Sequence, residues 1–113
     1  MADDLITMLE RKVTELERSV KMLRQNGVEA AQAERDYKIA LRTEALKMRD
    51  AGNAVGMITL TIYGVPSVAE LRFKRDVAQT IYDANREHIN ATKLEMRILE
   101  EQIKREWGTD LST

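Results

Sequence analysis

The sequence predicts a mostly α-helical protein, a long-helix hairpin or coiled coil that assembles into an oligomeric helical bundle. Three observations predict this fold class. Apolar residues recur every three or four positions over long stretches. One proline stands in 113 residues, of which 33% are charged. Aromatic residues make up only 4% of the chain, which excludes a large aromatic core.

The first 26 residues carry the strongest pattern. Apolar residues occupy alternating steps of three and four: Ile6, Leu9, Val13, Leu16, Val20 and Leu23. β-branched side chains at one heptad position with leucines at the other favour a parallel two-stranded coiled coil. We therefore expect residues 1–26 to form an oligomerisation helix between chains. Packing on the chain's own second helix, as in an antiparallel hairpin, would use the same stripe equally well.

Residues 27–108 are expected to form a helical hairpin. Asn26-Gly27 predicts a break or kink, with helix over residues 29–51 and a stop at Gly52. The apolar repeat continues in a degraded form through Gly27, so one continuous helix is the alternative.

The connection, residues 53–66, contains a short β-like segment. Ile58, Leu60 and Ile62 alternate with Thr59, Thr61 and Tyr63, the period of a half-buried strand. A lone strand needs another edge, so we expect it to pair with the same segment of a second copy or with a partner protein. The alternative is an irregular connector whose three aliphatic residues plug the end of the hairpin.

The last helix is predicted over residues 67–107. Ser67 and Glu70 have the spacing of a capping box, Gly108 is the expected stop, and residues 109–113 are an expected frayed tail. Two adjacent apolar stripes share its surface. One holds Val77, Ile81, Ala84, Ala91, Leu94 and Ile98, and the other holds Ala78, Tyr82, Ile89, Met96, Leu99 and Ile103. A face this wide predicts contacts with at least two other helices.

Composition argues against several functions. The chain has no cysteine, which excludes disulfides, thiolate metal sites and thiol nucleophiles. Its net charge of −1 disfavours generic nucleic-acid binding. The acidic start and the lack of an apolar run of about 20 residues predict a cytoplasmic protein with no membrane partner. The one histidine, His88, lacks the glutamate three positions earlier that helical metal sites use. We expect no enzyme activity, metal or cofactor.

One cluster could bind a ligand. Arg49 ends the second predicted helix, Tyr63 lies in the connection, and Arg72 and Arg75 begin the last helix. Arginines beside a helix start can bind phosphate or carboxylate groups. Acidic residues are interspersed, so ordinary surface ion pairs are the alternative interpretation.

Residues 34–107, about two thirds of the chain, resemble small helical accessory proteins of tailed phages and prophages of Gram-positive bacteria. The resemblance lies in Glu34-Arg35-Asp36-Tyr37, in Val68-Ala69-Glu70-Leu71-Arg72 with Arg75-Asp76, and in Arg105-Glu106-Trp107. It implies an accessory role and carries no functional residue.

These observations lead to one main hypothesis, a non-enzymatic, oligomeric helical binding protein. It would form a dimer or a higher even-numbered assembly. It would bind or sequester a host protein or a small anionic ligand, such as a signalling nucleotide, in the host cytoplasm. The alternatives are an accessory of phage DNA recombination or replication that acts through protein contacts, and a purely structural coiled-coil protein.

Overall fold

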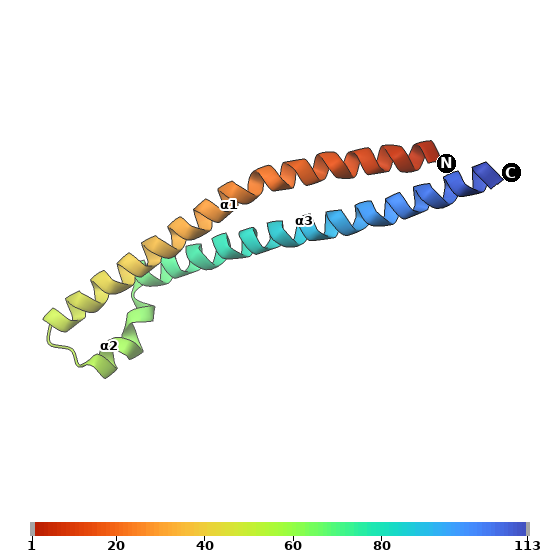
Figure 1. Cartoon of the computed structure of the whole chain (residues 1–113). Helices are drawn as coiled ribbons and strands as arrows, with labels where there is room; N and C mark the ends of the chain where they lie inside the picture. The colour runs from red at the N-terminus through yellow and green to blue at the C-terminus, as the bar shows by residue number, and fades with distance from the viewer. Residues whose placement is uncertain (1, 113) are drawn as a thin grey trace. The chain divides into compact units, whose positions relative to one another are not determined.

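The computed structural model describes residues 2–112, with side chains for residues 3–108, and the regular elements in this range are all helices. α1 (Ala2–Asp50) is followed by α2 (Val55–Thr61), the 3-10 turn η1 (Ile62–Gly64) and α3 (Pro66–Ser112) (Figure 1). The predicted all-α helical hairpin is confirmed. The predicted β-like segment is wrong, because the residues that were expected to form it are helical.

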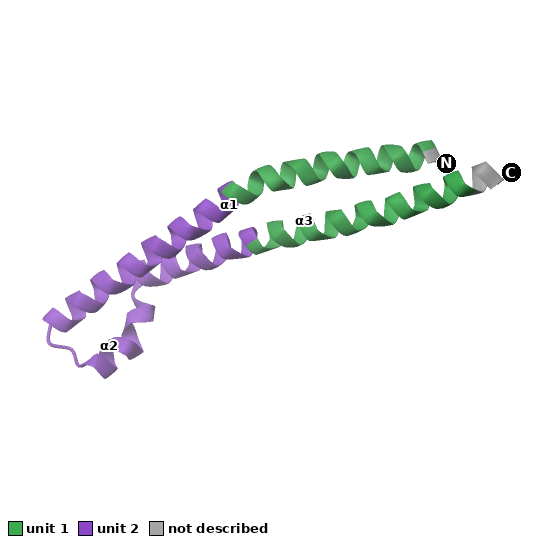
Figure 2. Cartoon of the chain, viewed as in Figure 1, with its two compact units in different colours: residues 1–24, 83–113 green, residues 25–82 purple. Residues whose placement is uncertain are grey.

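The chain divides into two compact units, each of which pairs a stretch of α1 with a stretch of α3 (Figure 2). The first unit contains residues 1–24 and 83–113, and the second unit contains residues 25–82. The expected oligomerisation helix, residues 1–26, therefore packs within its own chain on the second half of α3. Whether it also joins two chains stays a prediction.

The side chains that face inward recur every seven positions on both helices. On α3 they form two rows: Val68, Arg75, Tyr82, Ile89, Met96 and Ile103, and Leu71, Ala78, Asn85, Thr92, Leu99 and Glu106. On α1 the rows are Leu9, Leu16, Leu23, Ala30, Tyr37 and Glu44, and Leu5, Lys12, Ser19, Asn26, Ala33 and Ala40. This is the repeat of an antiparallel coiled coil. We call these residues the seam.

Helix α1 continues through Gly27, where the sequence predicted a break or kink. The second unit explains the glycine, since a Cβ at this position would lie 3.1 Å from Cε1 of Tyr82. Glycine within a helix costs about 1 kcal/mol relative to alanine. Here its missing side chain makes room for the Tyr82 ring, so packing and not helix termination accounts for it.

Gly52 ends α1 as the sequence predicted. Its φ of 89° is the left-handed conformation that glycine adopts without strain. The Gly52 N–H donates to the carbonyl of Arg49 at 3.0 Å, and the Asn53 N–H donates to the carbonyl of Met48 at 3.1 Å. This pair of bonds is a Schellman motif, which satisfies the last carbonyls of the helix.

The segment with β-like alternation forms α2 and η1, and its threonine hydroxyls are satisfied locally. The hydroxyl of Thr59 donates to the carbonyl of Val55 at 3.0 Å, and that of Thr61 donates to the carbonyl of Met57 at 2.8 Å. Ile58 and Ile62, four positions apart, share the inward side of the helical turn, and Leu60 lies outside. A helix also satisfies backbone groups that a lone strand would leave open.

Helix α3 begins one residue before the predicted 67–107 helix. Pro66 is its first residue, and the N–H of Ala69 donates to the carbonyl of Val65 at 2.9 Å, so Val65 holds the cap position. Ser67 therefore lies inside the first turn, and the predicted capping box is wrong. Gly108 does not end α3, which continues to Ser112. The side chains of the predicted tail, residues 109–113, lie outside the described residues.

Candidate functional site

One of the two predicted stripes on α3 lies on the seam and the other is uncovered. The seam stripe, which contains Ile89 and Leu99, is buried or half-buried throughout. The other stripe is exposed throughout, with Leu94 57% and Ile98 50% accessible. Helix α1 therefore covers only part of the apolar face of α3, and the expected contact with a further helix stays a prediction. We call Val77, Ile81, Ala84, Ala91, Leu94 and Ile98 the outer stripe.

The predicted oligomerisation residues of α1 separate into two groups. Leu9, Leu16 and Leu23 are half-buried on the seam, and Ile6 is half-buried beside it. Val13 and Val20 are 37% and 51% accessible, because the seam lies one helical position away from the predicted one. Lys12 and Ser19 take the inward places. Val13 and Val20 therefore add to the exposed apolar surface of α1.

In the second unit, the outer stripe borders a groove. Its walls come from both long helices: Asn26 and Glu29 of α1, and Phe73, Lys74, Val77, Ala78 and Ile81 of α3. Phe73, Val77 and Ile81 are exposed, and four positions separate each from the next. The groove is apolar along its floor and carries one acidic and one basic side chain at its margin. This chemistry suits a large aliphatic side chain better than a charged ligand.

In the first unit, a network of charged side chains links the two helices beside the seam. Nζ of Lys12 lies 2.5 Å from Oε2 of Glu95 and 3.3 Å from Oε2 of Glu15. Oε1 of Glu15 lies 3.1 Å from Nε2 of His88. The hydrogen bond to Glu95, and next that to Glu15, raises the pKa of Lys12 above its ordinary value. The sequence offered no signal that these four residues would meet.

The seam of the first unit is also polar. Ser19 is almost fully buried, and its carbonyl accepts a hydrogen bond of 3.1 Å from Nδ2 of Asn85. Thr92 is fully buried, and its hydroxyl finds no hydrogen-bond partner among the described residues. Polar groups inside a coiled coil restrict which helix and which register can pair, at a cost in stability.

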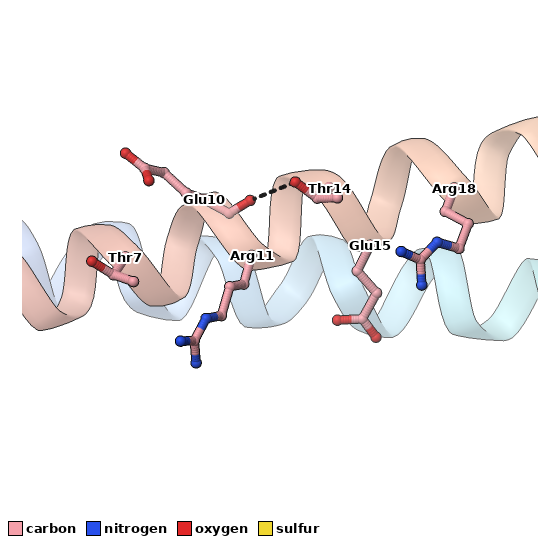
Figure 3. Close-up of a pocket in the computed structure, with 6 residues that line it drawn as sticks. All are labelled: Thr7, Glu10, Arg11, Thr14, Glu15 and Arg18. Atoms are coloured by element: carbon pink, nitrogen blue, oxygen red, sulfur yellow. Dashed lines mark hydrogen bonds between the residues drawn. The ribbon is translucent and has the colours of Figure 1, made fainter.

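A depression on α1 carries no sign of a ligand site. Its lining residues all come from α1: Thr7, Glu10, Arg11, Thr14, Glu15 and Arg18. Figure 3 shows the Thr14 hydroxyl donating to the carbonyl of Glu10, at 3.2 Å, while Arg11, Glu15 and Arg18 point to one side of the helix. Two acidic residues balance two basic ones, so this surface is an ordinary solvated helix face.

The end of the hairpin in the second unit is uncharged and largely exposed. Residues 51–69 contain no charged side chain, although a third of the chain is charged. Within α2 no residue is buried, and Val55 and Leu60 are 77% and 81% accessible. The charge-free run is visible in the sequence and could have identified this surface, which we call the tip.

The structure brings together two of the four residues predicted to bind an anion. The guanidinium of Arg72 lies 5.0 Å from the ring centroid of Tyr63, which is partly exposed. Arg75 instead lies 4.5 Å from the ring of Tyr37, with Glu34 at 3.5 Å and Asp76 at 2.8 Å. The Asp76 carboxylate raises the pKa of Arg75 above its ordinary value. Arg49 is exposed in the last turn of α1.

Among the described residues, no three metal-ligating side chains converge. No helix formed by the described residues has an apolar stretch long enough to cross a membrane. Comparisons with protein families, with curated proteins and with solved structures gave no match.

Proposed function

We propose that this chain is a non-enzymatic helical binding protein that works as a self-assembled oligomer. The observation that supports this proposal is the exposed outer stripe of α3. Two rows of α3 pack against α1 in the hairpin, and a third apolar row has no partner helix. A contiguous apolar row at heptad spacing is the surface by which a hairpin joins a four-helix bundle.

Solution mass tests the proposal. Light scattering should give twice the 13.0 kDa chain mass, or a higher even multiple. Ile98→Asp places a carboxylate in the outer stripe and should reduce the mass to that of one chain. Ile39→Asp is the matched control, because Ile39 is similarly exposed but lies on α1 away from the stripe. A single-chain mass for the unchanged protein at tens of micromolar would exclude self-assembly.

The tip gives the proposed assembly a second surface for a different molecule. Val55, Met57 and Leu60 are exposed without a charged neighbour in α2. Exposed apolar clusters of this kind mark protein interaction sites. We propose a host protein as the partner and a role as a phage or prophage accessory factor, which the resemblance of residues 34–107 supports. Leu60→Asp should abolish capture of that host protein without changing the oligomeric mass.

The contact between Arg72 and Tyr63 favours a second candidate, a small anionic ligand such as a signalling nucleotide. When a guanidinium lies over one face of an aromatic ring, its N–H groups can still bind phosphate. The other face of the ring can still stack on a base. Calorimetry with cyclic nucleotides should show heat at micromolar protein, and Arg72→Gln should remove it. Arg97→Gln, on α3 in the first unit, is the matched control. No heat with the unchanged protein would exclude this ligand class.

A further inference from the structure

We infer that the outer stripe of α3 binds the outer stripe of a second copy, in antiparallel orientation, about a two-fold axis between Glu87 and His88. This inference rests on the proposed self-assembly and specifies its geometry. A two-fold contact brings the same surface patch together from both copies. The stripe must then match itself when its direction is reversed, and four features of α3 meet this requirement.

The first feature is the matching of side-chain size. Residues at equal distances from the point between Glu87 and His88 would face each other across the axis. Val77 would face Ile98 of the second copy, and Ala84 would face Ala91. In this central row each larger aliphatic residue meets another, and each alanine meets an alanine. Ile81 and Leu94 flank the row on its two sides. All six are exposed in the single chain.

The second feature is the position of the alanines. Val77, Ala84, Ala91 and Ile98 are seven positions apart from one to the next, so they form one row along α3. Ala84 and Ala91 lie on either side of the axis, where the two helices would approach most closely. Small residues at this point permit close backbone approach, and the larger residues toward both ends fill the widening space.

The third feature is charge. The row of seven-residue steps continues to Glu70 at one end and Arg105 at the other, so antiparallel copies would place these opposite charges together. Both side chains are exposed. A parallel contact would instead place Glu70 on Glu70 and Arg105 on Arg105, and such like-charge contacts across an interface are unfavourable.

The fourth feature is the groove in the second unit. Val77 forms part of its lining, and Ile98 of the second copy is the residue that would face it. An exposed aliphatic side chain from the first unit of one copy would therefore lie against the groove in the second unit of the other. The two-fold axis repeats this contact, so both copies contribute both parts.

Cysteine cross-linking tests the orientation directly, because the natural chain contains no cysteine. Two single variants, Val77→Cys and Ile98→Cys, are mixed in equal amounts and oxidised, and each is also oxidised alone. The mixture should form a covalent dimer, because a disulfide requires Cα atoms within about 7 Å. Each variant alone should stay uncross-linked, since two copies of residue 77 would lie about 30 Å apart at 1.5 Å per residue. Ile39→Cys mixed with Ile98→Cys is the negative control.

The outcomes distinguish this inference from the proposed function. Cross-linking of either variant alone would indicate a parallel contact and would overturn the antiparallel geometry, although self-assembly would stand. A dimeric mass without cross-linking in the mixture would also overturn the geometry. A single-chain mass by light scattering would overturn both proposals.

A charge reversal gives an independent test. Glu70→Arg should weaken the dimer by bringing two positive charges together, and adding Arg105→Glu to the same chain should restore it. We expect the dissociation constant to rise about tenfold in the single variant and to recover in the double variant. Arg97→Glu is the control, because Arg97 lies on α3 outside the outer stripe. Failure of the double variant to recover would contradict the pairing of residues 70 and 105.

Discussion

The two units of the hairpin use the same helices but have different interiors. In the second unit every buried side chain is apolar or aromatic: Ala30, Tyr37, Ile62 and Val68. Among the described residues of the first unit, two of the four buried side chains are Ser19 and Thr92, beside Ile89 and Leu99. Buried polar groups favour one helix register over others, at a cost in stability. The two parts of the seam therefore differ in the polarity of the side chains that they bury.

Removing the central aromatic residue of the second unit should have the largest effect. Tyr37 is 5% accessible, and its ring contacts the Arg75 guanidinium. Tyr37→Ala should lower the free energy of unfolding by about 3 to 5 kcal/mol, because it removes the buried ring and the cation–π contact. Denaturant unfolding followed by circular dichroism measures the change. Ile39→Ala, an exposed change two residues away, should cost under about 0.5 kcal/mol.

Filling the space at Gly27 should have the next largest effect. Gly27→Val places a branched side chain where a Cβ already lies 3.1 Å from the Tyr82 ring. We expect a loss of about 2 kcal/mol from overpacking. Gly108→Val is the matched control, because no atom lies within 4 Å of a Cβ built at that helical glycine. If both variants unfold at the same denaturant concentration, the close packing of Gly27 against Tyr82 is wrong.

Replacing one buried polar residue of the first unit should raise the free energy of unfolding. Thr92→Val keeps the shape of the side chain and removes a buried hydroxyl that has no hydrogen-bond partner among the described residues. The free energy of unfolding should rise by about 1 kcal/mol. Thr14→Val should give no gain, because the Thr14 hydroxyl is exposed and bonded to the Glu10 carbonyl. A loss of stability in Thr92→Val would show that this hydroxyl is satisfied in solution.

The charged network of the first unit should give the smallest effect, visible at alkaline pH. The hydrogen bond to Glu95 raises the folded-state pKa of Lys12 above the ordinary value of 10.5. The network therefore contributes its full stability below that value and loses it as the pH rises through the folded-state pKa. Lys12→Met should reduce the fall in denaturation midpoint between about pH 9 and about pH 12. Lys21→Met, an exposed change on the same helix, should leave that fall in place.

Much of the fold could be predicted from the sequence, because the helical repeats are long. The hairpin, the stop at Gly52 and the excess apolar face of α3 all follow from periodicity and from one glycine with positive φ. The strand at Ile58 to Ile62 was wrong. Threonines that alternate with aliphatic residues favour strands, but a lone strand leaves backbone groups open that a helix satisfies locally. The break at Gly27 was wrong because the Tyr82 ring occupies the space of its side chain, a contact between residues far apart in the sequence.

The candidate surfaces were less predictable than the fold. The sequence identified the outer stripe as apolar surface beyond what one helix can cover. It did not identify the seam on α1, which lies one position away from the predicted row. Lys12 and Ser19 therefore point inward, and Val13 and Val20 stay outside. The separation of Arg75 from Arg72 was also beyond reach, because side chains three positions apart lie on neighbouring parts of a helix surface. Which arginine meets an aromatic ring is decided by the packing of Tyr37 and Tyr63.

The central claim, that a second copy covers the outer stripe, is tested most directly by unfolding at several protein concentrations. Folding that depends on association makes the denaturation midpoint rise with concentration. We predict such a rise for the unchanged protein between about 1 and 100 μM, and its disappearance in Ile98→Asp but not in Ile39→Asp. A midpoint that stays constant over this range, together with the mass of a single chain, would contradict the account.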